Sequence, residues 1–295
     1  MRRALVITNS FAGGDAVGVG RRALELLQTA GWDVEVVHTE TRGHGVLLAQ
    51  DAARGGLELV VAAGGDGTVR EVAAGLCGSE TALAIAPSGT GNSSYRELFE
   101  EEDWEQCLAR YLGAEATRAV DLNRVQPTGE LSLLGFSAGW FAQVVELAVT
   151  ETATGRARYA AAAQKAAAAP RAFNATVILD GEPFASGELG LVAVGGARRR
   201  GGVFPVLPDS RLDDGQLDVI AVQALDPVEF SDLLQLLLEQ RHRESPMVRL
   251  GRGRMLQIKS GMPLPAEVDG DLWQQDLCEC QVDVVPGALR VIAPA

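Results

Sequence analysis

Lysine is nearly absent from this chain of 295 residues, since Lys165 and Lys259 are the only two. A phosphate-binding loop of the Gly-Lys-Ser or Gly-Lys-Thr type is therefore excluded from the first half. Any phosphate bound there must be held by backbone N–H groups, arginine or a metal ion. The 26 basic residues are outnumbered by 39 acidic ones, and the net charge of −13 argues against nucleic acid as a partner.

Long apolar runs and metal-binding cysteine spacings are also missing. No stretch approaches the ~18 consecutive apolar residues of a membrane-spanning helix. The apolar run at 4–7 is too short for a signal peptide and is expected to begin a strand. Cys77, Cys107, Cys278 and Cys280 lack metal-ligand spacing and are expected to be reduced thiols. These features predict a cytoplasmic protein whose membrane contact, if any, is peripheral.

Peripheral contact with an anionic membrane would need a local basic patch, because the overall charge is repulsive. The clusters at 198–200 and 241–243 offer one, and solvated surface arginines are the plainer interpretation of each. The sequence leaves the oligomeric state, including a homodimer, open.

Residues 1–122 alternate between predicted strands and predicted helices. Apolar patterns predict strands at 4–9, 33–38, 57–63 and 82–86, and helices at 19–29, 46–53 and 69–76. Such alternation is typical of an α/β domain with a parallel sheet, whose ligands bind at the carboxyl ends of the strands.

Residues 123–283 instead show short strands and turns. Strands are expected at 131–136, 175–179, 189–194, 217–222, 254–259 and 281–285, with turns at Asp180-Gly181, Asp214-Gly215 and Pro286-Gly287. Helical inserts are expected at 140–169 and 227–240. This pattern predicts an all-β sandwich with helical inserts, and residues 284–295 are expected to return to the first domain.

Two glycine-rich turns follow consecutive strands of the first domain, Gly64-Gly65-Asp66-Gly67-Thr68 and Ser88-Gly89-Thr90-Gly91-Asn92. Glycine lets backbone N–H groups approach an anion closely, and a following helix N-terminus adds its positive dipole end. Side by side in a parallel sheet, the two turns predict a cradle for more than one phosphate. Asp66 fits such a site as a ligand of Mg²⁺ or of a ribose hydroxyl, and its structural alternative is a helix N-cap.

Two other segments match unrelated motifs. The Gly-x-Gly-x-x-Ala match at 18–23 resembles a dinucleotide fingerprint, but it starts about nine residues after the predicted strand end, where the fingerprint needs glycine at once. The Gly-x-Ser-x-Gly match at 135–139 would make Ser137 a hydrolase nucleophile. His242 is the only histidine after it, and a hydrolase would leave both phosphate turns unexplained.

Two acidic turns in the second half carry candidate chemistry. Asp214 could bind a cation together with neighbouring carbonyls, or could belong to an ordinary Asp-Gly turn. In the turn at 267–271, a carboxylate could act as general base on a hydroxyl if the fold brings it to the phosphates.

In this order, the motifs resemble the diacylglycerol kinase catalytic family, which holds bacterial lipid kinases, sphingosine kinases and ceramide kinases. The series begins with the Asn9-Ser10-Phe11-Ala12-Gly13 turn and continues through both glycine turns, Ser137–Gly139 and the acidic segments at 201–218 and 268–271. Gly-Gly-Asp-Gly-Thr alone also occurs in NAD kinases and phosphofructokinases, so the ordered set carries the specificity. The resemblance implies an α/β nucleotide domain and a β-sandwich, with ATP and acceptor meeting between them.

The family's functional residues carry over by motif. The resemblance implies that ATP and its Mg²⁺ contact Asn9, Gly64, Gly65, Asp66, Gly67, Thr68, Gly89, Thr90 and Asn92. It implies metal ligands at Asp66, Asp214 and Asp271, with Asp214 holding a structural Mg²⁺. Asp269 would be the general base that deprotonates a lipid hydroxyl for in-line attack on the γ-phosphate.

The chain departs from the family pattern at several positions. Ser93 and Gly196 stand where aspartate and asparagine are usual, Ser10 replaces proline, Gly14 and Asp15 replace a basic residue, and Asp271 replaces glutamate. We expect an ATP- and Mg²⁺-dependent kinase of diacylglycerol or a related lipid, acting in phospholipid metabolism at a membrane surface. The alternatives are a nucleotide- or lipid-binding member of the same fold that has lost efficient transfer, and a serine hydrolase that uses Ser137.

Overall fold

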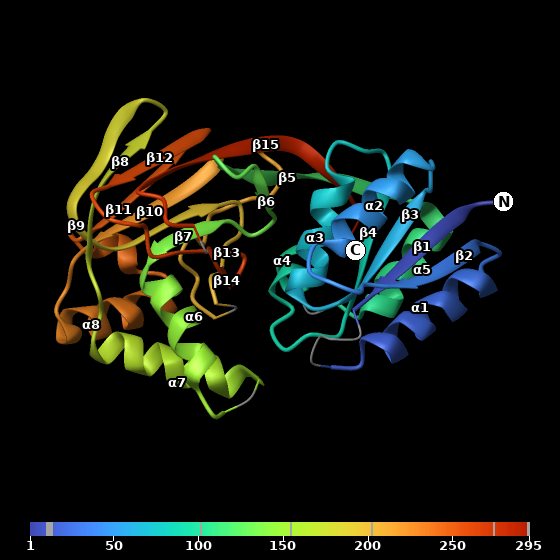
Figure 1. Cartoon of the computed structure of the whole chain (residues 1–295), viewed down its shortest axis with the longest axis horizontal. Helices are drawn as coiled ribbons and strands as arrows, with labels where there is room; N and C mark the ends of the chain where they lie inside the picture. Colours follow the sequence, from blue (N-terminus) through green and yellow to red (C-terminus); the bar gives the residue numbers. More distant parts are fainter. Residues whose placement is uncertain (10–13, 101, 154, 202, 274, 294–295) are drawn as a thin grey trace. The chain divides into compact units, whose positions relative to one another are not determined.

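The computed structural model describes residues 1–9, 14–100, 102–153, 155–201, 203–273 and 275–293. The chain forms two compact units (Figure 1). Unit 1 comprises Met1–Asp121 together with Gly287–Ala295, and unit 2 comprises Leu122–Pro286.

Unit 1 alternates strands and helices, as the sequence predicts. Its elements are β1 (Arg3–Thr8), α1 (Ala16–Thr29), β2 (Asp33–His38), α2 (His44–Arg54), β3 (Leu59–Gly64), α3 (Asp66–Leu76), β4 (Ala82–Pro87), α4 (Ser93–Phe99), α5 (Trp104–Ala114) and the start of β5 (Thr117–Gln126).

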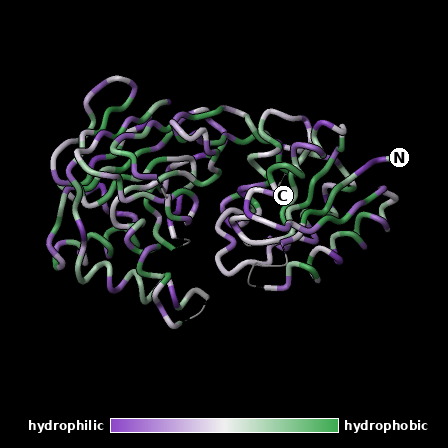
Figure 2. The backbone as a smooth tube through the Cα atoms, viewed as in Figure 1, coloured by the Kyte–Doolittle hydropathy of each residue, from purple (hydrophilic) through white to green (hydrophobic). Residues whose placement is uncertain are grey.

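The sheet of unit 1 is parallel, with the strand order β2-β1-β3-β4, and the end of β15 (Glu279–Ile292) adds beside β4. All six residues of β3 are buried, because a parallel sheet is covered by helices on both faces. Figure 2 shows this concentration of apolar residues along the strands. The strand order changes direction between β1 and β3, where open α/β sheets bind their ligands.

Helices α2 and α3 pack closely against each other. A Cβ added to Gly75 of α3 would lie 2.4 Å from the carbonyl oxygen of Val46 in α2, so only glycine permits this approach. Glu71 of α3 accepts hydrogen bonds from the N–H groups of Gly43 (2.7 Å) and Gly45 (2.9 Å). A side chain of α3 therefore caps the N-terminus of α2, whose own N-cap residue, Gly43, has no side chain to do so.

Unit 2 is built mainly of antiparallel strands. Its elements are β6 (Glu130–Ser132), β7 (Phe136–Gly139), α6 (Trp140–Thr150), α7 (Gly155–Ala168), β8 (Phe173–Leu179), β9 (Glu182–Gly195), β10 (Leu217–Gln223), α8 (Pro227–Leu238), η1 (His242–Glu244), β11 (Val248–Gly253), β12 (Met255–Ser260), β13 (Ala266–Val268), β14 (Asp271–Leu272) and most of β15.

Strand β9 organises unit 2, since it pairs with β7, β8 and β10 and is buried on both faces from Leu189 onward. Leu189, Val192 and Val194 point into the core of the β-sandwich. Leu191 and Ala193 alternate with them and pack against α6, α7 and α8, which lie together on the other face (Figure 1). The predicted fold class, an α/β domain followed by a β-sandwich with helical inserts, is confirmed.

Three local predictions are wrong. The run at 131–136 is not one strand but two, β6 and β7, because the backbone at 133–135 turns its N–H groups toward the carboxylate of Asp269. Pro286-Gly287 is no turn, since β15 continues through it with Gly287 at φ 58°. The insert at 140–169 divides into the two helices α6 and α7.

Each of the two basic clusters contains a residue that the fold buries. Arg200 is only 5% exposed and donates to the carbonyl oxygens of Leu134 (2.6 Å) and Val194 (2.7 Å). His242 is fully buried. A solvated surface is therefore the wrong interpretation of these two residues. In the part of the chain that the structure describes, no helix is long and apolar enough to cross a membrane.

His242 predicts a pH-dependent stability. Burial lowers the pKa of its imidazole, so below about pH 6.5 the unfolded chain binds a proton that the folded chain does not. The stabilisation is complete above that pH, and the free energy of unfolding should fall by up to about 1.4 kcal/mol per pH unit below it. Urea unfolding between pH 5 and 8 checks this, with His242→Gln expected to be less pH-dependent than wild type.

The matched control is His44→Gln, which changes a half-buried histidine of unit 1. Other groups titrate in the same range, so the decisive quantity is the difference between variant and wild type at each pH. Equal pH dependence of His242→Gln and wild type would contradict the prediction.

Candidate functional site

The two glycine-rich turns meet at the carboxyl ends of β3 and β4. A Cβ added to Gly89 would lie 2.5 Å from the Cα of Gly65, so the two backbones touch and leave no room for a side chain. The N–H of Ser88 donates to the carbonyl oxygen of Gly64 (3.0 Å), which extends the strand pairing into the turns. A Cβ on Gly64 would lie 2.5 Å from the Thr68 hydroxyl, so this glycine is also required by space.

The segment after β1 reaches the second of these turns. Gly14 has φ 120°, and a Cβ there would lie 1.9 Å from the carbonyl oxygen of Ser88. Asn9, at the end of β1, is half-buried. The remainder of the predicted turn, residues 10–13, lies outside the described residues. Three chain segments thus converge on one edge of the sheet.

Asp66 and Asn92 fix the turns with their side chains. Oδ1 of Asn92 accepts from the N–H of Gly89 (2.9 Å), and Asn92 itself is left-handed with φ 50°. Oδ1 of Asp66 accepts from the N–H of Ser94 (2.8 Å). Asp66 therefore caps the N-terminus of α4. The N-cap alternative drawn from the sequence holds in this changed form, because the capped helix is not α3, to which Asp66 belongs.

This edge of the sheet suits an anion. The first N–H groups of α3 have no partner within the helix and lie at its positive dipole end. Gly67 and Thr90 are exposed, whereas the buried Thr68 hydroxyl has no hydrogen-bond partner among the described residues. Asp66 supplies the one carboxylate of the two turns, and its Oδ2 lies near Gly91, where an added Cβ would be 3.0 Å away.

Asp269 of unit 2 is held by a dense set of donors. The backbone of Asp269 has φ 49°, a left-handed conformation that aspartate tolerates in turns. Its carboxylate accepts four hydrogen bonds, from Ser132 Oγ (2.6 Å) and from the N–H groups of Leu133, Leu134 and Gly135 (2.9 Å each). Three of them go to Oδ1 and one to Oδ2. Because each carboxylate oxygen has two lone pairs, Oδ2 keeps the capacity for one more donor.

A second, fully buried carboxylate stands behind this turn. Glu267 accepts from Ser137 Oγ and from the N–H of Gly270 (2.6 Å). Burial raises the pKa of the Glu267 carboxyl, and the Arg200 guanidinium opposes that shift. Arg200 also binds the carbonyl of Leu134, whose N–H holds Asp269. Glu267 and Arg200 therefore support the backbone that positions Asp269.

Ser137 is not placed as a nucleophile. It lies inside β7, is fully buried and donates to Glu267. His242 is buried elsewhere in unit 2, and the Ser137 hydroxyl is engaged by Glu267 instead, so no serine–histidine pair forms. This geometry gives the hydrolase alternative no support.

Asp271 and Asp214 are the two predicted metal ligands of unit 2. Asp271 is exposed on β14. Both oxygens of Asp214 are already engaged, Oδ1 by the N–H of Gln216 (3.1 Å) and Oδ2 by the guanidinium of Arg252. Across the described residues, no group of three or more His, Cys, Asp or Glu side chains could hold a metal ion. A divalent cation at Asp214 would therefore have to displace one of these donors, whereas Asp66 has an oxygen to offer one.

Comparison with known proteins decides the family. Residues 3–125 match the family described as the diacylglycerol kinase catalytic domain, and residues 135–293 match the YegS C-terminal NAD kinase beta sandwich-like domain. A relative from Pseudomonas fluorescens, named "Probable lipid kinase YegS-like", is 30% identical over 281 residues, covering 93% of this chain and 90% of its own length. The chain belongs to the YegS-like lipid kinase family.

Two solved structures share the fold of this kinase. A diacylglycerol kinase from Bacillus anthracis str. Sterne superposes with a TM-score of 0.74 at 22% identity, covering 99% of this chain and 96% of that one. An NAD kinase from Archaeoglobus fulgidus, solved in complex with ATP, has a TM-score of 0.50 at 12% identity and covers 98% and 93% of the two chains. The fold class predicted from the sequence is thereby found in both kinds of kinase.

Sequence reasoning placed Arg200 in a basic cluster and Glu267 in an acidic turn without finding their supporting roles, and it did not single out Arg252 of this lipid kinase. A glutamate between Ala266 and Val268, in a stretch that forms a buried strand, is the one available signal for Glu267. The roles of Arg200 and Arg252 depend on strand pairing and loop course, which single-sequence periodicity does not resolve.

The contact between the glycine turns predicts an asymmetric response to alanine. Gly89→Ala should lower the free energy of unfolding by about 1–3 kcal/mol, because its Cβ would meet the Cα of Gly65. Gly67→Ala is the matched control, since an added Cβ there meets nothing within 4 Å. Denaturant unfolding of both variants checks this, and equal stabilities would contradict the described contact.

Proposed function

We propose that this protein transfers the γ-phosphoryl group of ATP, with Mg²⁺, to a hydroxyl of diacylglycerol or a related lipid. The observation that carries the proposal is the backbone contact of the Gly65 and Gly89 turns at the N-terminus of α3. Two adjoining glycine turns and a helix N-terminus offer N–H groups to a chain of phosphates without any lysine.

Family membership and the residues at the sheet edge support ATP and Mg²⁺. The related NAD kinase structure is a complex with ATP, although it resembles this chain in fold alone. Mg²⁺ is commonly bound through one or two carboxylates together with substrate phosphates, and Asp66 offers one carboxylate beside the turns. When bound, the ion would neutralise phosphate charge that backbone donors alone leave uncompensated.

In this proposal, Asp269 is the general base. The lipid hydroxyl donates its proton to Oδ2, the carboxylate oxygen that accepts a single hydrogen bond, from Leu133. The hydroxyl oxygen forms a bond to the γ-phosphorus as the bond to the β,γ-bridging oxygen breaks, and ADP leaves. Backbone donors and Ser132 fix the carboxylate before reaction, so little reorganisation is needed.

The names of related proteins support a lipid acceptor. The relative from Pseudomonas fluorescens is named a lipid kinase, and the Bacillus anthracis protein is named a diacylglycerol kinase. A diacyl lipid is presented at a membrane surface, so the proposal includes peripheral membrane contact.

The test is incubation with Mg²⁺-ATP and a bacterial lipid extract, pure diacylglycerol or sphingosine, followed by mass spectrometry of the lipids. We expect a product heavier by one phosphoryl group. Asp269→Asn should lower kcat by about 10²–10⁴-fold, because its amide has no basic oxygen. Asp276→Asn is the matched control, an exposed aspartate of the same unit.

Asparagine also places an NH₂ group among the N–H donors around position 269, so the fold of that variant must be checked by circular dichroism and thermal unfolding. Full activity of a folded Asp269→Asn protein would contradict its role as base. Protection against unfolding by ATP without any lipid product would favour the non-catalytic binding alternative.

A separate prediction concerns Asp66. Asp66→Asn keeps an oxygen that can accept from Ser94 but removes the charge, so the fold should persist while Mg²⁺-ATP binds about tenfold more weakly. Calorimetric titration with and without Mg²⁺ measures this. An unchanged affinity in Mg²⁺ would contradict the assigned role.

A further inference from the structure

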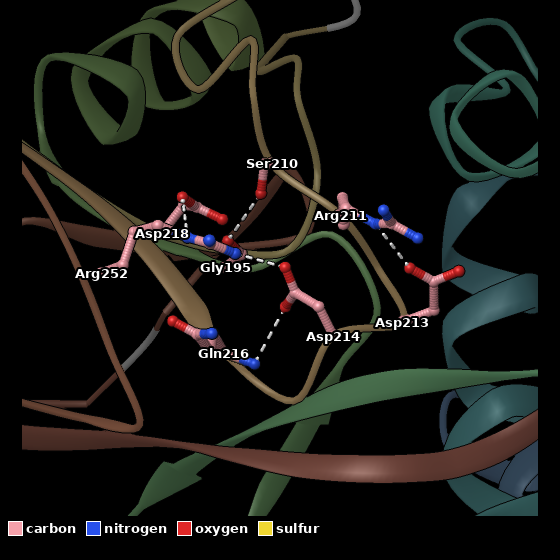
Figure 3. A network of polar contacts seen from close by, with 8 residues as sticks. All are labelled: Gly195, Ser210, Arg211, Asp213, Asp214, Gln216, Asp218 and Arg252. Carbon is pink, nitrogen blue, oxygen red and sulfur yellow. Dashed lines mark hydrogen bonds and ion pairs between the residues drawn. The ribbon is translucent and has the colours of Figure 1, made fainter.

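Two carboxylates of unit 2 share one guanidinium (Figure 3). Nη2 of Arg252 contacts Oδ2 of Asp214, and Nε of Arg252 lies 3.0 Å from Oδ1 of Asp218. The resemblance to lipid kinases implies that Asp214 holds a structural Mg²⁺, whereas this chain places an arginine against that carboxylate.

The sheet fixes the position of this arginine. Asp218 of β10 and Arg252 of β11 are directly opposite each other in the antiparallel ladder, so their pairing follows from strand register. The side chain of Asp218 is 8% exposed and that of Asp214 is 19% exposed, so the two carboxylates are largely withdrawn from solvent. Arg252 itself is 45% exposed, so its guanidinium lies on the solvent side of the two carboxylates.

The loop that carries Asp214 is tied down by the same contacts. Oδ1 of Asp214 accepts from the N–H of Gln216 (3.1 Å), which closes a turn within the loop, while Oδ2 binds Arg252. The neighbouring Asp213 pairs with Arg211 (3.0 Å) instead (Figure 3). Three carboxylates thus face two guanidinium groups, and both oxygens of Asp214 already have a donor that a divalent ion would have to displace.

We propose that Arg252 replaces the structural metal ion of this loop: its guanidinium pairs with both Asp214 and Asp218 and holds the 210–218 segment to the sheet without any divalent cation. Arginine is charged at every accessible pH, and its planar fork can bind two carboxylates at once. A cation at Asp214 would have to displace this guanidinium and bring its own charge beside it. The 210–218 segment then needs no metal ion to hold its place.

The test is thermal unfolding of the full chain without nucleotide or lipid, in EDTA and in millimolar Mg²⁺ or Ca²⁺. Any metal effect at Asp66 or elsewhere is removed by comparing wild type with Asp214→Asn. The two proteins should show the same metal-dependent shift in Tm. A larger shift in wild type would overturn the proposal, because Asp214 would then bind the ion.

A second arm tests the arginine itself in EDTA. Arg252→Gln should lower Tm by about 2–4 °C more than the matched control Arg254→Gln, which changes an exposed arginine two residues further on. Arg252→Lys keeps the charge but loses the fork, so its Tm should lie between wild type and Arg252→Gln. Equal Tm values for Arg252→Gln and Arg254→Gln would overturn the proposal. Because no substrate is present, neither result bears on the kinase activity.

Discussion

The close approach of two backbones, at Gly65 and Gly89, is the constraint on which the candidate site of unit 1 depends. The added-Cβ distance of 2.5 Å excludes any side chain at Gly89, and the contact follows directly from the pairing of Gly64 with Pro87 at the ends of β3 and β4. With the turns pressed together, Asn92 and Asp66 use their side chains to hold the second turn and α4. The result is an edge of backbone N–H groups with a single carboxylate, which is the chemistry of a polyphosphate site.

The carboxylates of the second unit are held in three different ways. Glu267 is buried, and desolvation raises the pKa of its carboxyl. Asp269 is surrounded by backbone N–H groups and one hydroxyl, which favours a fixed orientation. Asp214 and Asp218 share the guanidinium of Arg252. Asp269 combines fixed geometry with an oxygen that accepts a single hydrogen bond, and this combination supports its proposed role as base.

Much of this architecture could be predicted from the sequence, because hydrophobic periodicity and glycine turns are local signals. The parallel strands of unit 1 and both glycine turns belong to this class. The break between β6 and β7 could not be predicted, since it depends on Asp269, a residue more than a hundred positions away. The burial of Arg200 and the pairing of Arg252 likewise depend on strand register. The course of β15 through Gly287 depends on the return of the chain to unit 1.

The most direct test of the phosphate site is the binding of ATP and adenosine to the wild-type protein in Mg²⁺, measured by calorimetric titration. If the glycine turns bind the phosphates, ATP should bind at least about tenfold more tightly than adenosine, and Gly89→Ala should lose that difference. Gly113→Ala, in α5 with open space around it, should retain the difference. Equal affinities for ATP and adenosine in the wild-type protein would contradict a phosphate site at this edge of the sheet.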